Sequence, residues 1–410
     1  MPLIWPTSRG WFVLLTGLMW FLIAVVNHML FPFIFACGAF ALALASFCGT
    51  LVALSGVSVR RGPVGDAATG QTVAMPLLVK NELDRPRQPL VVLEHCPFAL
   101  EQPTRTVVES LDAAEERVVQ RRILAMHRGE FELSRIFLRS GDPAGLFCQQ
   151  RSFRCPKKMV VVPGTEPLPD LRPSLRYSIL TTVGSPVSAA GISQDFYGVR
   201  EYNPTDGLRH IHWKSSARFH HLMVQEYERN AVMSVAVLLD ADERHVSSRD
   251  IGSNLEYQIR AAASICTHMA GLYCSLSFAA GGQSMTLMPT RLATQALQEI
   301  LLQLAVLKAG PIPVDRVAYD LAMRLPRNTV VYCLTLDTAD PARDALRVLE
   351  QQGMGVRWFC APPEAFPPLR PMPDPAAPAA EVAPRRRVSG PTQPSLLHRG
   401  MGLARALTGD

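Results

Sequence analysis

The chain has 410 residues, of which 48% are hydrophobic and 19% are charged, and its formal net charge is +6. A positive charge this mild argues against a protein built mainly to bind nucleic acid, and the length allows two domains besides an anchor. The nine cysteines contain no C-x-x-C pair, which predicts reduced packing residues and no disulfide framework or zinc site.

The N-terminal segment is predicted to be a membrane anchor. No Lys, Arg, Asp or Glu occurs between Gly10 and Val59. Because a bilayer core needs about 20 apolar residues per helix, residues 1–59 are expected to form a transmembrane helical hairpin. Its spans are predicted at about 11–31 and 33–57, with Pro32 between them. A cleaved signal peptide is disfavoured, because its apolar region would be much shorter.

The basic residues that flank the two spans predict the orientation. Arg9 precedes the first span, and Arg60 and Arg61 follow the second, whereas the short loop between the spans has no Lys or Arg. The positive-inside rule then places both termini and the soluble body in the cytoplasm. The first predicted partner is therefore the lipid bilayer, with two passes through the plasma (inner) membrane.

Residues 60–170 are predicted to form a β-rich, sandwich-like domain. Short segments rich in Val, Leu, Ile and Phe alternate there with Gly- and Pro-containing turns. The composition of Asp112–Met126 also allows a helix, but its alternation favours a strand. The expected strands are 71–79, 89–94, 131–138 and 159–162.

Residues 231–361 are predicted to form an α/β doubly wound domain. Strands and helices alternate along this part of the chain, an order typical of a mostly parallel sheet. Two strands end in an acid, Asp240 and Asp337. The expected strands are 234–240, 272–280, 284–288, 328–337 and 355–360, and the expected helices are 254–271, 291–308 and 341–352.

Residues 362–410 are predicted to be a disordered tail, because Pro, Ala, Arg and Ser dominate the segment after Ala361. The run Arg385–Arg387 could contact anionic lipid or remain solvated.

Residues 171–230 contain the most distinctive motif. The apolar pair Ile211 and Trp213 lies among charges of both signs, and residues 203–207 have the composition of a turn. Such a segment can fold as a polar network of paired Arg and carboxylate side chains. Whether it is a docking face or a folding device stays open. The candidate binding or structural residues are Arg200, Tyr202, Asp206, Arg209, Trp213, Arg218 and Glu228.

This motif closely resembles the signature of the domain of unknown function 58 family, R-x-Y-x-P-G-D-x-x-R-x-I-x-W-x-x-x-A-R followed by Leu and Glu. The chain has Thr205 where the signature has glycine. Upstream, Arg128-Gly129 and the segment 142–147 resemble the R-G and D-P-F-G-L-F patterns of the family, with Ala144 in place of the first Phe. The resemblance covers about residues 10–360.

The resemblance implies a von Willebrand factor A-like domain after the motif. It also implies association with bacterial MoxR-type AAA+ ATPases, in the assembly or maturation of envelope or metalloprotein complexes. No enzymatic activity is implied for the family as a class.

The acidic residues that follow two strands of the α/β domain are candidates for a divalent-cation site. Many von Willebrand factor A domains bind a divalent cation through D-x-S-x-S and acidic or hydroxyl residues of other loops, because Mg²⁺ prefers oxygen ligands. Here Asp240, Asp242, Asp337 and Thr338 could supply such ligands, but Arg244 replaces the second serine. The alternative is a degenerate loop whose acids cap helices, and no cofactor is then expected.

Other chemistries have weaker support in the sequence. The pairs His210/His212 and His220/His221 suggest a metal centre, although the motif accounts for the first pair without one. The acidic residues among Arg209–Arg218 and its surroundings argue against nucleic acid as a partner. The chain has neither a G-x-S-x-G nucleophile motif nor a phosphate-binding loop.

These patterns favour a non-enzymatic, membrane-tethered interaction or scaffold protein that works with a MoxR-type AAA+ ATPase. The alternative is a divalent-metal-dependent hydrolase that uses the carboxylates at the strand ends. A third interpretation, an enzyme of the outer envelope, requires the reversed topology and is disfavoured by Arg9, Arg60 and Arg61.

Overall fold

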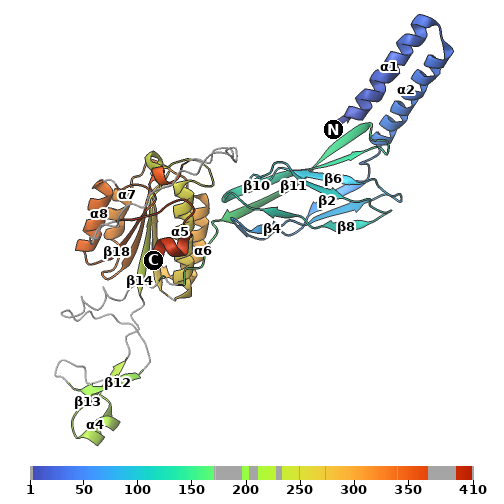
Figure 1. Cartoon of the computed structure of the whole chain (residues 1–410). Helices are drawn as coiled ribbons and strands as arrows, with labels where there is room; N and C mark the ends of the chain where they lie inside the picture. Colours follow the sequence, from blue (N-terminus) through green and yellow to red (C-terminus); the bar gives the residue numbers. More distant parts are fainter. Residues whose placement is uncertain are drawn as a thin grey trace.

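The computed structural model describes residues 3–169, 171, 196–202, 211–227, 233–248, 250–272, 274–338, 340–367 and 394–408. Figure 1 shows a helical hairpin at one end, a β domain next to it, and an α/β domain beyond the β domain. A small unit of two strands and one short helix is drawn apart from the α/β domain.

The helical hairpin consists of α1 (Ser8–Asn27) and α2 (Leu30–Leu51). Helices of this length are about 30 Å long, which matches the hydrocarbon core of a bilayer. Both predicted spans are confirmed as helices, but each begins and ends several residues earlier than predicted. The turn is made by His28, whose φ is 50°, and Pro32 lies in the first turn of α2, where proline is tolerated.

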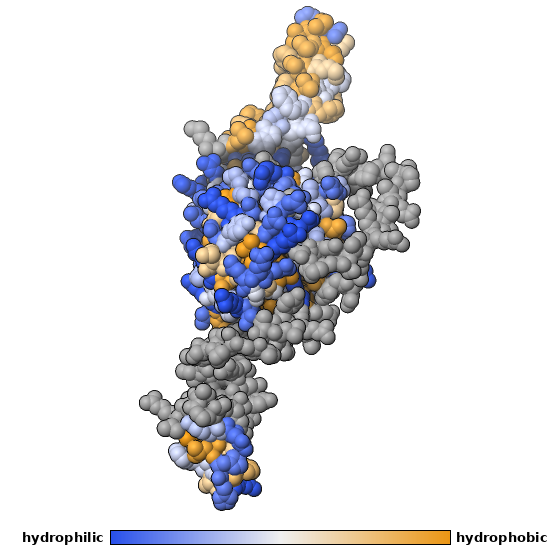
Figure 2. Space-filling model, turned by 90° about the vertical axis from the view of Figure 1, so that its left-hand side faces the viewer, coloured by the Kyte–Doolittle hydropathy of each residue, from blue (hydrophilic) through white to orange (hydrophobic). Residues whose placement is uncertain are grey.

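The surface of the hairpin is apolar, as Figure 2 shows in orange. Large side chains such as Phe12, Val26 and Phe31 are 71–77% exposed, whereas the buried positions are mostly small residues such as Gly17 and Ala36. Small residues between the helices and large apolar residues outside are typical of helices that pack in lipid. Both helices are long and apolar enough to cross a membrane.

The β domain is built from two main sheets that face each other. The first has the order β1-β11-β10-β6-β7, with β3 beside β11; the second has the order β2-β5-β8, and β4 pairs with β9. Side chains from both sheets, including Val79 and Ile136, form one core cluster. The strands are β1 (Leu3–Pro6), β2 (Val57–Arg61), β3 (Ala67–Ala68), β4 (Thr72–Ala74), β5 (Leu77–Asn81), β6 (Leu90–Glu94), β7 (Thr104–Val108), β8 (Glu116–Val119), β9 (Arg122–Leu124), β10 (Gly129–Gly141) and β11 (Phe147–Val162).

A buried group of three charges lies within the β domain. The carboxylate of Glu94, whose side chain is 1% exposed, forms ion pairs with Arg61 and, at 2.7 Å, with Arg121. Arg61 also donates to the carbonyl of Cys155, and Arg121 to that of Met75, both at 3.3 Å. The carboxylate therefore neutralises one of two guanidinium charges that the fold keeps from water.

The segment 142–147 connects the β domain to the helical hairpin. Asp142 accepts hydrogen bonds from the hydroxyl of Ser46 on α2 and, at 2.9 Å, from the backbone N–H of Phe147. The Thr7 hydroxyl, which caps α1, donates to the carbonyl of Gly145 at 2.7 Å. Gly10 permits this close approach, because a Cβ there would lie 2.1 Å from the carbonyl oxygen of Leu146. The segment thus binds both helices.

Arg87 provides a second connection, at the C-terminal end of α2. Its Nη1 donates to the carbonyl of Val52 at 2.6 Å, and its Nη2 donates to the carbonyl of Ser55. Gln149 on β11 accepts from the backbone N–H of Leu54 at 3.1 Å. Carbonyls and N–H groups that would otherwise lack partners at the helix end are thereby satisfied.

Asp142→Ala is expected to lower the free energy of unfolding by about 1–3 kcal/mol, because several buried donors lose their acceptor. Burial alone would raise the pKa of Asp142, but the hydrogen bonds from Ser46, Phe147 and Ala144 hold this pKa below its ordinary value. The ionised Asp142 therefore contributes its full stabilisation above its pKa in the unfolded chain, about 3.9. This stabilisation is lost as the pH falls through its lower pKa in the folded protein.

Thermal unfolding of the full chain in detergent, followed from pH 8 to pH 3, measures this contribution. The difference in unfolding temperature between the wild type and Asp142→Ala should be constant down to about pH 5 and should then become smaller. Asp66→Ala, which removes an exposed aspartate of the same domain, is the control. A gap that widened in acid would contradict the assignment.

The α/β domain has a six-stranded sheet with the order β16-β15-β14-β17-β18-β19. Every neighbouring pair is parallel except β15 and β16, which are antiparallel. The strands are β14 (Ser234–Leu239), β15 (Ser275–Ala280), β16 (Thr286–Leu292), β17 (Val330–Thr335), β18 (Gly355–Cys360) and β19 (Ser395–Leu396).

Helices cover both faces of this sheet (Figure 1). On one face, α5 (Asn254–Gly271) and α6 (Ala293–Val306) share a core cluster with Val237 and Phe278. On the other face, α7 (Val314–Ala322) and α8 (Asp340–Gln351) pack on Leu238 and Cys333. The predicted alternation of strands and helices is present, and α7 is an element that the sequence analysis did not predict.

The C-terminal part of the chain differs from the predicted disordered tail. Residues 394–408 form β19 and α9 (Leu403–Thr408). Leu397, Leu403 and Leu407 belong to the same core cluster as α5 and α6. The average composition of 362–410 obscured these apolar positions.

Arg128 joins the β domain to the α/β domain. Its Nε donates to the carbonyl of Leu304 at 2.9 Å and its Nη2 to that of Leu307 at 2.5 Å, at the C-terminal end of α6. Its Nη1 forms an ion pair with Glu256 in the first turn of α5. The following residue, Gly129, has a φ of 145°, which favours glycine. The R-G pattern therefore serves as a connection between domains.

Candidate functional site

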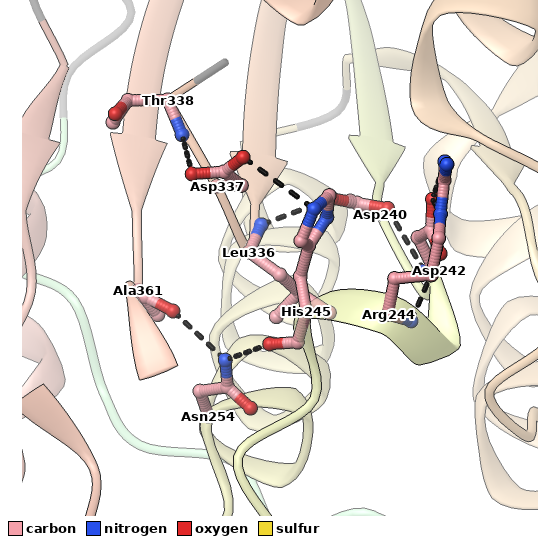
Figure 3. Close-up of polar contacts among 9 residues, drawn as sticks. All are labelled: Asp240, Asp242, Arg244, His245, Asn254, Leu336, Asp337, Thr338 and Ala361. Carbon is pink, nitrogen blue, oxygen red and sulfur yellow. Dashed lines mark hydrogen bonds and ion pairs between the residues drawn. The ribbon is translucent and has the colours of Figure 1, made fainter. Parts of the chain in front are cut away.

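The first candidate site lies where the strand order of the α/β sheet reverses. After β14 the chain forms β15 on one side, whereas β17 lies on the other side of β14. In open α/β sheets, ligands bind outside the carboxyl ends of the strands at such a point. The predicted residues Asp240, Asp242, Asp337 and Thr338 are all found there (Figure 3).

Asp240 joins the ends of two neighbouring strands. It follows β14 directly and is 2% exposed. Its Oδ1 accepts the backbone N–H of Asp242 and its Oδ2 accepts that of Leu336 after β17, both at 3.0 Å. Burial raises the pKa of Asp240, although both backbone hydrogen bonds oppose the rise. Both oxygens thus have protein donors.

Asp242 is paired with Arg244, which extends over it from the short helix η2 (Glu243–His245). Arg244 Nε lies 3.0 Å from both carboxylate oxygens, and Nη2 lies 2.5 Å from Oδ2. The hydrogen bond from Arg244 lowers the pKa of Asp242, while burial opposes this effect. The pair is charge-assisted and has two parallel contacts, which makes it strong and directional.

Asp337 and its neighbours form the rest of this site. One oxygen of Asp337 accepts the backbone N–H of Thr338 at 2.7 Å, and the other lies 3.5 Å from His245 Nε2. Asn254, at the start of α5, holds the loop by donating to the carbonyls of His245 at 2.8 Å and Ala361 at 3.0 Å. No sequence pattern pointed to the roles of His245 and Asn254.

These residues do not fit a divalent cation. Mg²⁺ needs several oxygen ligands directed at one point, but Asp240 is engaged by backbone N–H groups and Asp242 by a guanidinium. Within the described residues, no group of three or more His, Cys, Asp and Glu side chains is placed to hold a metal ion. The positive charge beside Asp242 comes instead from Arg244.

Mg²⁺ is therefore expected to leave the unfolding temperature of the wild type unchanged. The double variant Asp242→Ser/Arg244→Ser has the pattern D-x-S-x-S at residues 240–244, and Mg²⁺ should raise its unfolding temperature by several degrees, because a ligand that binds only the folded state stabilises it. Differential scanning fluorimetry checks this, with NaCl of equal ionic strength as the control. A rise for the wild type would contradict the role assigned to Arg244.

The second candidate site is the small unit formed by the signature segment. Strand β12 (Phe196–Glu201) pairs with β13 (Met223–Tyr227), and α4 (Trp213–Phe219) lies between them in the sequence. Ser216 on α4 accepts the backbone N–H of Met223 at 2.8 Å. Ile211 is 7% exposed and forms a β-bridge with Val224. The apolar residue of the predicted pair that is buried is therefore Ile211.

Trp213, the other member of that pair, is 68% exposed. Phe219 and Leu222 are 51% and 41% exposed, and Lys214 and Arg218 are exposed as well. Figure 2 shows apolar and polar residues side by side on this unit. Aromatic residues and arginine are enriched at protein–protein interfaces.

The remaining predicted residues have varied positions. Arg200 lies on β12 opposite Val224, and Tyr202 follows that strand. His212 caps α4, accepting the backbone N–H of Ser215 at 3.2 Å. The Nε2 of His221, which precedes β13, lies 3.2 Å from Oε1 of Glu201 at the end of β12. Asp206, Arg209, His210 and Glu228 lie outside the described residues, as does the turn at 203–207.

Three solved structures show low similarity to the chain. An aerotolerance-related membrane protein from Bacteroides fragilis NCTC 9343, with multiple mutations to serines, is 12% identical; 43% of this chain and 87% of that chain are covered, with a TM-score of 0.25. A β-glucosidase from Listeria innocua in complex with isofagomine is 15% identical; 26% of this chain and 16% of that chain are covered, with a TM-score of 0.18. A β-glucosidase from Kluyveromyces marxianus is 12% identical; 26% of this chain and 15% of that chain are covered, with a TM-score of 0.14.

The chain thus spans less than a fifth of the length of either glucosidase. TM-scores this low do not establish a shared fold or a shared activity. No curated protein matches the chain. One protein family does match, over residues 198–352, and it is described as "Protein of unknown function DUF58". The predicted resemblance to this family is therefore confirmed for residues 198–352, which include the motif and most of the α/β domain, whereas it was predicted for about residues 10–360.

Proposed function

We propose that this protein is a membrane-tethered docking module without enzymatic activity of its own. The helical hairpin anchors it, the β domain holds the α/β domain at a distance from the bilayer, and the signature unit binds a partner protein. The proposed partner is a cytoplasmic AAA+ ATPase of the MoxR type, acting in the assembly or maturation of envelope or metalloprotein complexes. The flanking Arg9, Arg60 and Arg61 support a cytoplasmic body.

The strand order supports a von Willebrand factor A-like α/β domain. Numbered along the chain from β14, the order is 3-2-1-4-5-6, which is that of a doubly wound sheet, and the third strand is the antiparallel one. The carboxylates at its switch point are bound to protein groups. That arrangement disfavours the alternative function, a metal-dependent hydrolase.

The observation that carries the proposal is the exposure of Trp213. A tryptophan at the centre of the most specific motif would be buried if the motif served only to fold the domain. It is 68% exposed, with Phe219 and Leu222 also exposed on the same unit. Tryptophan and arginine are enriched among the residues that dominate protein–protein binding energy, and Arg218 is exposed on the same unit.

Trp213→Ala is expected to reduce the amount of AAA+ ATPase that copurifies with the full chain by about 30-fold, the effect of losing about 2 kcal/mol at a binding hot spot. The measurement is affinity purification from native membranes in mild detergent. Met323→Ala, which truncates an 82% exposed side chain on the α/β domain, is the matched control.

Equal unfolding temperatures for the two variants would show that both are folded. An equal yield of ATPase from both would remove Trp213 as the docking residue. Absence of any ATPase from the wild-type sample would contradict the proposed partner.

A further inference from the structure

The C-terminal segment 394–408 packs against strand β18, helix α5 and the linker after β11, and the surface that it covers is called the groove below. Leu397, Leu403, Ala406 and Leu407 are at most 5% exposed, and all four belong to the large core cluster of that domain. Arg405 is exposed between them. The segment therefore presents one apolar face to the domain, with leucines at helical spacing in α9.

Three different parts of the chain form the walls of this groove. Strand β18, which would be the edge of the sheet without β19, pairs in parallel with β19, and its Cys360 carbonyl accepts the backbone N–H of Leu397 at 2.7 Å. On α5, the Tyr257 hydroxyl donates to the carbonyl of Met401 at 2.9 Å. The linker after β11 contributes Glu166, whose Oε2 accepts the backbone N–H of Leu403 at 3.1 Å. A strand added to a sheet edge and a helix in an apolar groove are two common modes of peptide recognition.

The chain leaves the domain and returns to it at nearly the same place. Arg399, in the returning segment, donates from Nη1 to the carbonyl of Pro367 at 2.6 Å, and Pro367 is the last described residue before the connection. A few residues would bridge such neighbouring ends, yet the connection runs from 368 to 393. Connections longer than about 12–15 residues are uncommon within a compact domain and are either functional segments or linkers, so this one is long enough to act as a tether.

We propose that residues 394–408 are a tethered ligand of a strand-and-helix docking groove, able to leave the groove and return to it. A tether gives its ligand a high effective concentration, so the groove is filled even when the affinity of the segment itself is modest. The occupant is this chain's own segment, recognised by its leucines and by backbone hydrogen bonds.

Occupation of the groove also fixes the junction between the two domains. Oε2 of Glu166 accepts the hydrogen bond from the backbone N–H of Leu403, while Oε1 lies 3.6 Å from Nε of Arg260 on α5. The backbone N–H of Glu166 donates to the hydroxyl of Ser264 at 2.9 Å. The linker residues Leu168 and Leu171 are buried in the same cluster as α9. Departure of the segment removes one partner of Glu166 and part of the cluster that buries these leucines, so hydrogen exchange in the linker should increase.

The test uses the full chain in detergent, with a recognition sequence for a specific protease inserted between Arg387 and Val388. After cleavage, a fluorescent peptide of residues 388–410 is added and its anisotropy is measured. We expect saturable binding to the cleaved protein, and binding at least about 100-fold weaker to the uncleaved protein, because the tethered segment competes. The Leu403→Asp peptide should bind at least tenfold more weakly, whereas the Arg405→Glu peptide should bind like the wild type.

The full-chain variant Leu403→Asp provides an independent measurement. Its own segment cannot dock, so the uncleaved variant should bind the wild-type peptide, and hydrogen exchange in residues 163–169 should increase. Unfolding of the α/β domain in this variant or after cleavage would overturn the proposal, since the segment would then be a permanent part of the core. A cleaved segment that never exchanges with added peptide would overturn it as well.

Discussion

Glu94→Ala is expected to unfold the β domain under conditions in which the wild type is folded. The substitution leaves Arg61 and Arg121, whose side chains are 6% and 2% exposed, without a counter-charge. Removing one partner of a buried ion pair costs about 3–5 kcal/mol, because the remaining charge is kept from water. That is a large share of the 5–15 kcal/mol by which a typical domain is stable.

Urea unfolding of the full chain, monitored through hydrogen exchange in β6 and β10, measures the stability of the β domain separately. The matched control is Glu132→Ala, because Glu132 is an exposed glutamate on β10 of the same domain. A Glu94→Ala variant with the unfolding midpoint of the control would mean that water reaches the two guanidinium groups, in contradiction to their burial.

Arg128→Ala is expected to have the second-largest effect, at the junction of the two domains. It leaves the carbonyls of Leu304 and Leu307 and the carboxylate of Glu256 without the donor that now joins them. Hydrogen bonds that involve a charged group contribute about 1.5–3 kcal/mol each, so we expect a loss of at least about 2–4 kcal/mol of junction stability. The C-terminal end of α6 should also exchange its amide hydrogens faster.

Distances between spin labels on the β domain and the α/β domain measure the junction directly. A single narrow distance distribution in the wild type should broaden in Arg128→Ala. Arg128→Lys is the informative control, because lysine keeps the charge but cannot direct three nitrogens to three partners. It should give an intermediate width. Identical distributions for all three proteins would show that other contacts hold the junction.

The hairpin and the α/β domain were predictable because their signals come from single elements. An uncharged run of this length and the apolar stretch of β14 have few alternative structures. The helix α5 was predicted with the bounds that the structure has. The predicted boundary between the spans, Pro32, lies within α2, because a proline in the first turn of a helix costs little and does not end it.

Other elements were missed because their signal is short or polar. Strand β11 extends from Phe147 to Val162, but only residues 159–162 were predicted, because many side chains in its first part are polar and exposed. Leu403, Ala406 and Leu407 have helical spacing, yet six residues of α9 give little signal beside a Pro- and Ala-rich neighbourhood.

The candidate site was predictable in its residues but not in its bonds. The acids Asp240, Asp242 and Asp337 were predicted to lie at the strand ends, and they do. Their partners could not be read from the sequence, because a carboxylate can bind a cation, a guanidinium or backbone N–H groups. The conformation of the loop, with Arg244 directed at Asp242, decides between these.

Because residues 394–408 complete the core of the α/β domain, they also impose an order on its synthesis. The helical hairpin and every strand of the β domain lie within residues 3–162, so these parts can fold while translation continues, as N-terminal domains generally do. The α/β domain reaches its final packing only after Leu407 has left the ribosome. Until then its groove is open, and a nascent chain already anchored in the bilayer exposes that apolar surface to chaperones and proteases.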